Sequence, residues 1–428
     1  MHGRRYPPGC RSALVSRAHR HALYVYDAEV LQARIDAICA LTAAPGLQAR
    51  YAMKACSAAP VLARMRAQQI WIDAVSGNEV LRARAAGYPL NAAVPEVMLT
   101  TDVFRDNALD VVRDYGVLPN IGSPAMVHAL AAVGYRGPLG LRLNPGFGHG
   151  HVQSCDTGGP SSKHGIWCDD ALSVAHEATR HGMSVVLLHA HIGSGPTVAE
   201  FMTNMQHLVS FFAACLDAYP QVHTVNFGGG IPHPYRPGTP TADLAAFGHL
   251  LREAQARFSQ DTGRAIRVEI EPGRYFVAPA AYVVTRVTDV KRTQANTKGP
   301  GQTFVMVDAG FCDLIRPAMY GAFHHLSVWN APSDATPELT ILAGPLCESG
   351  DVFTRDAAEL LQPRPLPPVQ IGDLVLIHDA GAYGYTMSSN YNSLGRAPQL
   401  WLENGTPYLI SRRETFEDIV RTECFISL

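Results

Sequence analysis

Side chains able to do acid–base or nucleophilic chemistry recur in this sequence directly after short apolar runs. Lys54 follows such a run in RYAMKACS, Asp73 in IWIDAVSGNE and Glu271 in VEIEPGR. Other polar side chains and a glycine triplet stand in the same position: Arg142, Asn144, His189, His191 and Gly228-Gly229-Gly230. Each alone has a simple structural explanation, because a lysine at a strand end is usually a solvated charge. Together at one rim, an amine, imidazoles, a glycine loop and an acid indicate a catalytic site.

Eight short apolar runs alternate with helical patterns over the first 275 residues. The runs predict strands near 49–54, 70–75, 95–100, 117–121, 138–143, 184–190, 222–227 and 266–271. Apolar spacings of three and four predict helices at 28–43, 58–68, 77–87, 124–134, 169–181, 197–217 and 241–257. Eight strand–helix units are the number in a (β/α)8 TIM-type barrel, whose catalytic groups stand at the carboxyl ends of the strands.

Past residue 280 the pattern changes to β-branched runs separated by Pro- and Gly-rich turns. Asn404-Gly405 lies between two alternating segments and is the commonest signal for a tight hairpin. The chain therefore divides into a barrel domain at 28–275 and a β-rich domain. The β-rich domain consists mostly of the C-terminal segment 276–428, together with residues 1–27.

Composition excludes several classes of protein. The 428 residues carry 35 Lys and Arg against 37 Asp and Glu, a net charge of −2 that is atypical of nucleic-acid or membrane-surface binding. No apolar stretch is long enough for a membrane helix, and the Arg-rich N-terminus lacks the apolar run of a secretion signal. Nine scattered cysteines without a CxxC pair indicate reduced thiols. We therefore expect a cytoplasmic protein that acts on a small molecule.

The candidate rim residues suit one cofactor. Lys54 has apolar neighbours, so partial desolvation should lower its pKa and make it a nucleophile toward carbonyl groups. Gly193-Ser194-Gly195 and Gly228–Gly230 can present backbone N–H groups to a phosphate. Glu271 can keep a pyridine nitrogen protonated, and His191 can stack on the ring. These properties describe pyridoxal 5′-phosphate (PLP) on a barrel.

Seven motifs carry a resemblance to a known family, in the same order from about residue 22 to the C-terminus. They are YAMKACS, DAVSGNE, HAHIGSG, NFGGGIP, EPGR, CESGDVF and GAYGYTMSSNYNS. They resemble those of the barrel-type PLP-dependent decarboxylases with the alanine-racemase fold, and among these the diaminopimelate decarboxylases. The resemblance implies conversion of meso-2,6-diaminopimelate to L-lysine and CO2, the last step of lysine synthesis.

The resemblance also assigns roles to residues of this chain. Lys54 would bond the cofactor, His191 would stack on its ring and Glu271 would contact its nitrogen, with Asp73 beside the lysine amine. The phosphate would be held by Ser194, Gly229 and Gly230, with Tyr383 reaching both phosphate and substrate.

The remaining implied roles concern the substrate and a second subunit. Arg274, Arg316 and Tyr320 would bind the distal carboxylate, and Glu348 the distal ammonium. Cys347 would deliver a proton to the carbon that loses CO2. In this family Cys347 and Glu348 are donated across the interface of a head-to-tail homodimer, so the β-rich domain completes the active site of the partner subunit.

Two other functions stay open at this stage. A PLP-dependent decarboxylase of lysine, ornithine or a siderophore precursor shares most of the motifs, although a simple diamine-forming enzyme has no use for Arg316 and Tyr320. A metal-dependent barrel hydrolase would assemble zinc ligands from His149, His151, His189, His191 and Asp308. That hydrolase leaves Lys54 without a role, and we expect no metal.

Overall fold

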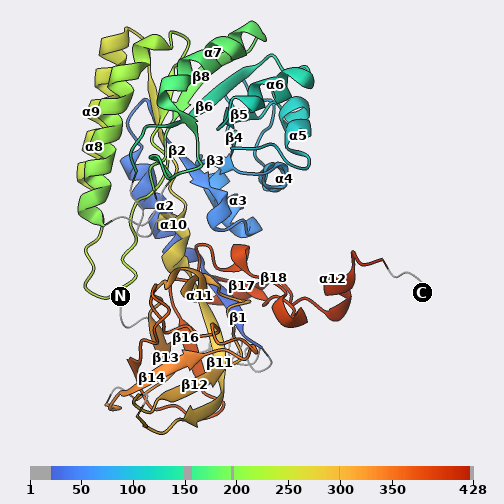
Figure 1. Cartoon of the computed structure of the whole chain (residues 1–428), viewed down its shortest axis with the longest axis vertical. Coiled ribbons are helices and arrows are strands. Elements are labelled where there is room, and N and C mark those ends of the chain that lie inside the picture. Colours follow the sequence, from blue (N-terminus) through green and yellow to red (C-terminus); the bar gives the residue numbers. More distant parts are fainter. Residues whose placement is uncertain (1–20, 149–156, 194–196, 298, 333, 425–428) are drawn as a thin grey trace. The chain divides into compact units, whose positions relative to one another are not determined.

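A computed structural model describes residues 21–148, 157–193, 197–297, 299–332 and 334–424 (Figure 1). Contacts divide the chain into two compact units. The first comprises Met1–Gln32, Tyr235–Thr239 and Val277–Leu428, and the second comprises Ala33–Pro234 and Pro240–Phe276. We call them the β unit and the barrel unit. The domain boundaries inferred from the sequence stay a prediction.

The barrel unit contains a closed ring of parallel strands among the described residues. In order around the ring these are β2 (Leu47–Ala52), β3 (Trp71–Ala74), β4 (Val97–Thr101), β5 (Leu118–Ile121), β6 (Pro138–Asn144), β8 (Ser184–His189), β9 (Thr224–Asn226) and β10 (Arg267–Ile270). Parallel pairing of β10 with β2 closes the ring, and the two-residue β7 (Ile166–Trp167) pairs with β6 outside it. All eight predicted barrel strands are therefore present, and the predicted barrel fold is confirmed.

Helices surround the strands on the outside of the barrel (Figure 1). They are α2 (Ala28–Leu41), α3 (Ala59–Ala67), α4 (Gly77–Ala85), α5 (Ala108–Tyr115), α6 (Ala125–Ala132), α7 (Ala171–Arg180), α8 (Val198–Cys215) and α9 (Leu244–Thr262). The sequence analysis missed α5, whose eight residues bury only Ala108, Val111 and Val112 and so give a short periodic signal. The start of α8 is fixed by a capping box between Thr197 and Glu200.

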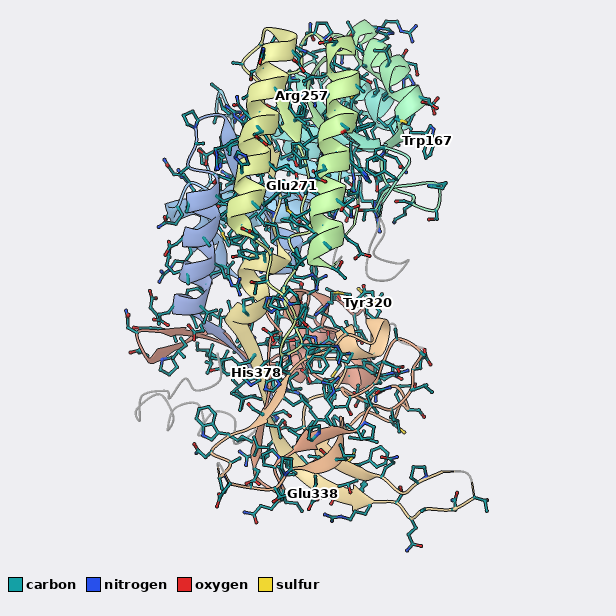
Figure 2. The ribbon with its side chains drawn as sticks, turned by 90° about the vertical axis from the view of Figure 1, so that its left-hand side faces the viewer. Trp167, Arg257, Glu271, Tyr320, Glu338 and His378 are labelled. Carbon is teal, nitrogen blue, oxygen red and sulfur yellow. The ribbon has the colours of Figure 1, made fainter. Side chains whose placement is uncertain are left out.

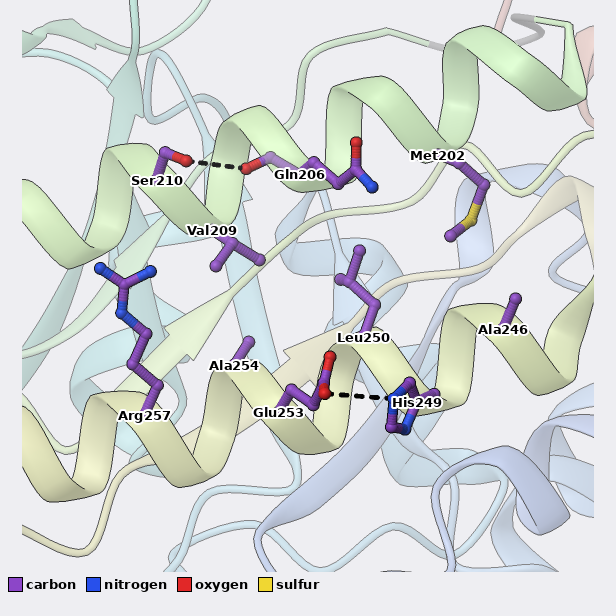
Figure 3. A pocket seen from close by; sticks show the side chains of 10 residues that line it. All are labelled: Met202, Gln206, Val209, Ser210, Ala246, His249, Leu250, Glu253, Ala254 and Arg257. Carbon is purple, nitrogen blue, oxygen red and sulfur yellow. Dashed lines mark hydrogen bonds and ion pairs between the residues drawn. The ribbon is translucent and has the colours of Figure 1, made fainter.

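The two longest helices, α8 and α9, lie side by side and leave a groove of about 500 Å³ between them (Figure 3). Met202 and Leu250 contribute apolar surface to it, and an ion pair joins His249 Nε2 to Glu253 Oε1 at 3.1 Å. Its lining residues all come from the outward-facing helices, so this groove is separate from the polar side chains at the strand ends.

The β unit is built on a mixed sheet with the strand order β15-β14-β12-β11-β1-β17-β18, to which β16 and β13 are joined through β11. The strands are β1 (Leu23–Asp27), β11 (Ala281–Arg292), β12 (Thr303–Val307), β13 (Leu326–Val328), β14 (Glu338–Ala343), β15 (Arg364–Leu366), β16 (Leu374–Ile377), β17 (Gln399–Glu403) and β18 (Thr406–Ser411). Two short helices, α11 (Arg316–Tyr320) and α12 (Phe416–Val420), complete the unit. The predicted β-rich domain is thus observed.

The strand nearest the N-terminus lies inside this sheet. β1 pairs antiparallel with β11 and parallel with β17, and its Leu23 and Val25 are fully buried in a cluster with Leu400 and Leu402. At the predicted hairpin, Asn404 and Gly405 have φ of 49° and 74°, the positive values that a type I′ turn requires.

Among the described residues, no helix is both long enough and apolar enough to cross a membrane. The described cysteines are all free thiols.

Candidate active site

Lys54 and Asp73 come from neighbouring strands of the barrel. Lys54 lies in the single 3-10 turn Met53–Ala55 that follows β2, and Asp73 lies within β3. Their Nζ and Oδ2 atoms are 3.9 Å apart, with Asp73 buried and the Lys54 side chain 42% exposed. The Lys54 side chain is thus only partly shielded from solvent, as its apolar neighbours predict, and it extends from the turn and not from the strand itself.

Glu271, which directly follows β10 and is labelled in Figure 2, is held by two buried neighbours. Asn226 Nδ2 donates to Glu271 Oε1 at 2.8 Å, and His189 Nε2 lies 3.1 Å from Oε2. Since an ionised carboxylate only accepts hydrogen bonds, His189 Nε2 carries the shared proton. His189 Nδ1 is buried and has no hydrogen-bond partner in the described part of the chain.

The pKa values of the two buried carboxyl groups, Asp73 and Glu271, are shifted in opposite directions. Burial, together with the charge of Glu271, raises the pKa of Asp73 to about 7 although Lys54 opposes the rise. Burial also acts against ionisation of Glu271, but the charge and hydrogen bond of His189 outweigh it and lower that pKa to about 2. Two coupled carboxyl groups in one buried site resist joint ionisation. Glu271 keeps its charge because it has the imidazole partner, and Asp73 titrates near neutral pH.

His191 is half-buried, two residues after His189. Burial first, and then the positive charges of Arg142 and Lys54, lower its pKa well below the ordinary value of 6.5. The imidazole is therefore neutral at physiological pH, the state that suits stacking on an aromatic ring.

The glycine triplet after β9 approaches other backbone and side chains closely. A Cβ on Gly228 would lie 2.6 Å from the Cβ of His191, and one on Gly230 would lie 2.9 Å from the carbonyl oxygen of Gly193. Gly228 and Gly230 also have φ of +65° and +112°, which other residues rarely adopt. The loop therefore brings backbone close to the imidazole, and only glycine fits at Gly228 and Gly230. Ser194, the other expected phosphate ligand, lies outside the described residues.

These features fit PLP. A buried carboxylate stays ionised, a neutral imidazole and a glycine loop adjoin it, and a buried polar atom of Arg142, Nε, has no hydrogen-bond partner in the described chain. An amine stands at the same rim, 3.9 Å from a second carboxyl group. The set supplies a partner for each polar part of the cofactor: ring nitrogen, phosphate and carbonyl.

The β unit holds the other predicted residues, apart from Arg274, which begins the short helix α10 (Arg274–Val277) that continues into this unit. Arg316 begins α11 and is buried; its Nη1 donates to Tyr235 Oη at 3.2 Å and lies 3.3 Å from His324 Nε2. Tyr320 ends the same helix, half-buried (Figure 2).

Cys347 and Glu348 are exposed on a loop that follows β14. The loop is held from beneath by the buried carboxylate of Asp351, which accepts hydrogen bonds from Leu346 N at 2.8 Å and from Phe311 N at 2.7 Å. Tyr383, half-buried in the loop after β16, has φ of 57°. A positive φ is rare for an aromatic residue and marks a position that the surrounding structure enforces.

Comparison with known proteins decides the family. A family model for "Pyridoxal-dependent decarboxylase, pyridoxal binding domain" matches residues 32–278. The diaminopimelate decarboxylase of Streptomyces coelicolor is 38% identical over 418 residues, which cover 97% of this chain and 92% of the relative. The chain belongs to the diaminopimelate decarboxylase family.

Solved structures of the family agree in fold. A crystal structure of diaminopimelate decarboxylase is 37% identical, with a TM-score of 0.88 and coverage of 96% of each chain. A second, from Helicobacter pylori and complexed with L-lysine, is 25% identical, with a TM-score of 0.82 and coverage of 96% of this chain and 98% of that one. The predicted family, fold and PLP cofactor are therefore confirmed.

Family membership also removes the hydrolase alternative. His189 bonds to Glu271, while Asp308 belongs to the β unit, where its Oδ1 accepts hydrogen bonds from Thr285 Oγ1 and Arg286 N. The other two proposed zinc ligands, His149 and His151, lie outside the described residues.

The sequence analysis missed buried polar groups that support Asn226, the neighbour of Glu271. Glu269 Oε2 accepts a hydrogen bond from Asn226 Nδ2 at 3.2 Å, and Arg50 bonds Glu269 through both Nε and Nη2, at 2.6 and 3.1 Å. A chain of buried polar groups thus runs from Arg50 to Glu271 across the barrel interior. The sequence contained a sign of this chain, because Glu269 in β10 and Glu271 directly after it are two residues apart and so face the same side.

Proposed function

We propose that this protein is the PLP-dependent decarboxylase that converts meso-2,6-diaminopimelate to L-lysine and CO2, the last step of lysine biosynthesis. The observation that carries the proposal is the 38% identity to a diaminopimelate decarboxylase over 97% of the chain, which includes both units. The solved relative bound to L-lysine, the product of this reaction, supports the same substrate class.

Within the barrel, each residue has a task that its surroundings explain. PLP, when bound, supplies an electron sink for the electron pair left behind by CO2. Lys54 would bond the cofactor, and the ionised Glu271 would favour a proton on the ring nitrogen. The neutral His191 would stack on the ring. Gly229 and Gly230 would donate backbone N–H groups to the phosphate, and the sequence predicts the same role for Ser194.

Asp73 moves a proton to and from Lys54. Its pKa of about 7 means that it is protonated in part of the molecules at neutral pH, and its Oδ2 is 3.9 Å from the Lys54 Nζ. A carboxyl group poised near the working pH is suited to general acid–base exchange with the amine.

In the β unit, the guanidinium of Arg316 is held in an orientation that suits binding of the distal carboxylate of the substrate. Its guanidinium stacks over the Tyr235 ring at 5.1 Å and is oriented by the buried His324, whose Nδ1 is 2.9 Å from the carbonyl oxygen of His378. A planar fork held in this way matches a carboxylate. Tyr320, Arg274 and Tyr383 complete that end of the substrate site, and Glu348 binds the distal ammonium.

Cys347 donates the proton that replaces CO2, and it acts in the active site of the partner subunit of a homodimer. The exposure of Cys347 and Glu348 in the isolated chain supports this arrangement, as does the loop held in shape by Asp351. We further infer a cytoplasmic enzyme, in keeping with the free thiols of the described cysteines.

The substrate is tested by measuring CO2 release by the PLP-loaded enzyme from meso-diaminopimelate, L-lysine, D-lysine and L-ornithine. We expect turnover of diaminopimelate alone and its loss in Lys54→Ala. Arg316→Met should raise KM for diaminopimelate far more than it lowers kcat. Turnover of a diamino monocarboxylate in preference to diaminopimelate would refute the substrate and the role of Arg316.

Shared active sites are tested by mixing two inactive variants, Lys54→Ala and Cys347→Ala. If Cys347 acts across a dimer interface, each heterodimer contains one intact site and one doubly mutated site. Random exchange in an equimolar mixture makes half of the dimers heterodimers, so about a quarter of wild-type activity returns. No recovery, with sedimentation showing that the subunits exchange, would place Cys347 and Lys54 in one subunit's site.

A further inference from the structure

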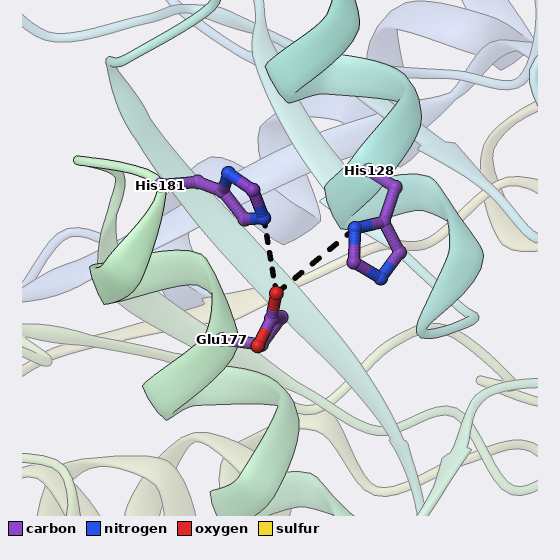
Figure 4. A group of neighbouring side chains, drawn as sticks. All are labelled: His128, Glu177 and His181. Atoms are coloured by element: carbon purple, nitrogen blue, oxygen red, sulfur yellow. Dashed lines mark hydrogen bonds and ion pairs between the residues drawn. The ribbon is translucent and has the colours of Figure 1, made fainter.

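Three potential metal ligands converge on the outer surface of the barrel, where α6 and α7 are neighbours (Figure 4). His128 belongs to α6, Glu177 to α7, and His181 caps the carboxyl end of α7. Glu177 Oε1 lies 3.0 Å from His181 Nε2 and 4.0 Å from His128 Nδ1, and the three ligand atoms all lie within 4.8 Å of one another. None of the three has a role in the proposed decarboxylase.

The separations suit a tetrahedral ion. Zn²⁺ binds imidazole nitrogen and carboxylate oxygen at about 2.0–2.2 Å, which places tetrahedral ligand atoms roughly 3.3–3.6 Å apart. The two measured separations from Glu177 Oε1 bracket that range, so small side-chain rotations suffice to enclose an ion. Helix positions four apart face the same side, and this brings Glu177 and His181 together without backbone movement.

The directions of the rings are also favourable. The rings of His128 and His181 are 5.5 Å apart and nearly perpendicular, at 86°. Figure 4 shows one nitrogen of each ring facing the same oxygen of the Glu177 carboxylate. Two imidazoles and one carboxylate are ligands that Zn²⁺ accepts, with water in the fourth position.

Competition for the carboxylate is weak. Arg180 also pairs with Glu177, but its side chain is 73% exposed and can turn into solvent. Exposed ion pairs contribute little to stability, so an ion that binds Glu177 displaces Arg180 at small cost.

We propose that His128, Glu177 and His181 form a surface site for Zn²⁺ or a similar transition-metal ion, with water as the remaining ligand. The ion would join α6 to α7 and stabilise this side of the barrel. The site is independent of the proposed decarboxylase chemistry.

The test is equilibrium dialysis of metal-free, PLP-loaded enzyme against ZnCl2, with thermal unfolding measured in parallel. His128→Ala and His181→Ala should each bind one Zn²⁺ fewer per chain than the wild type. They should also lose the rise in melting temperature that Zn²⁺ produces. His176→Ala is the matched control, because His176 is an exposed histidine of the same helix outside the group.

Exposed thiols also bind Zn²⁺, so the difference between variant and wild type is the quantity that counts. Repeating the dialysis with Ni²⁺, which favours imidazole, should give the same difference. Equal numbers of bound ions in wild type, His128→Ala and His181→Ala would overturn the proposal. Equal loss in the His176→Ala control would overturn it as well.

Discussion

His189 Nε2 lies 3.1 Å from Oε2 of Glu271, and both side chains are buried at the rim of the barrel. This pair explains why, of two coupled buried carboxyl groups, Glu271 keeps its charge. His189 therefore positions the residue that we place at the cofactor ring nitrogen, while touching no substrate itself.

His189→Leu should weaken PLP binding about 10- to 100-fold, the cost of losing one hydrogen bond to a buried charge. Burial then raises the pKa of Glu271, so PLP affinity of the variant should fall further between pH 7.5 and 5.5. The Glu271 pKa of about 2 keeps that contribution constant in the wild type over the same range. Titration of the apoprotein with PLP, followed by absorbance, measures the effect.

Two controls separate this role from a purely structural one. His189→Gln, which keeps a donor, should recover part of the affinity. In a Glu271→Gln background, His189→Leu should cause little additional loss. An unchanged additional loss in that background would show that His189 does not act through Glu271.

Asp73→Asn should stabilise the cofactor-free protein, and increasingly so as pH rises. The folded-state pKa of Asp73 is raised to about 7, so the native protein binds its proton more tightly than the unfolded chain does. Stability is then lost as pH increases from the unfolded pKa through 7, and the substitution removes that loss. The difference in unfolding free energy should grow by about 2–3 kcal/mol between pH 5 and 8, measured by urea denaturation. A difference independent of pH would refute the raised pKa.

Arg50→Met should lower the unfolding free energy by about 3–5 kcal/mol, because it leaves Glu269 as a buried charge without its partner. Arg50 and Glu269 are only 2% and 1% exposed. Arg113→Ala is the matched control, since Arg113 bonds Asp114 on the surface at 2.6 Å and should change stability little. Similar losses in both variants would contradict the role of burial.

Gly230→Ala should reduce PLP affinity at least about 10-fold, because a side chain at φ of +112° strains the loop and crowds Gly193. Gly299→Ala provides the control, since a Cβ there meets nothing within 4 Å. Fluorescence titration with PLP compares the two. Unaltered affinity in Gly230→Ala would remove this loop from the phosphate site.

The sequence was sufficient for the barrel because its strands are short, apolar and regularly separated by helices. It was also sufficient to predict that Lys54, Asp73 and Glu271 lie at one rim, because residues at the carboxyl ends of parallel barrel strands share that rim. The sequence did not predict that Lys54 would leave β2 in a 3-10 turn. That turn depends on local backbone geometry and not on residue type.

The partners of Glu271 were missed for another reason. His189, Asn226 and Glu269 come from three different strands, and their contacts depend on the register between β8, β9 and β10. Periodicity within one strand shows which side chains face inward, but not which of them meet. The spacing of two residues between Glu269 and Glu271 was the available sign, because two acids that face the same side of a strand indicate a polar barrel interior.

The place of β1 in its sheet has a consequence for the order in which the protein can fold during synthesis. β1 is made first, yet its two sheet partners begin at Ala281 and Gln399, after the whole barrel has been translated. At about 5–20 residues per second, the apolar strand waits roughly ten seconds to a minute for its first neighbour. The barrel can complete its ring in that interval, whereas the β unit remains open until β17 has been made. A nascent chain of this protein therefore exposes an unpaired strand until β11 emerges, and needs protection there from pairing with other chains.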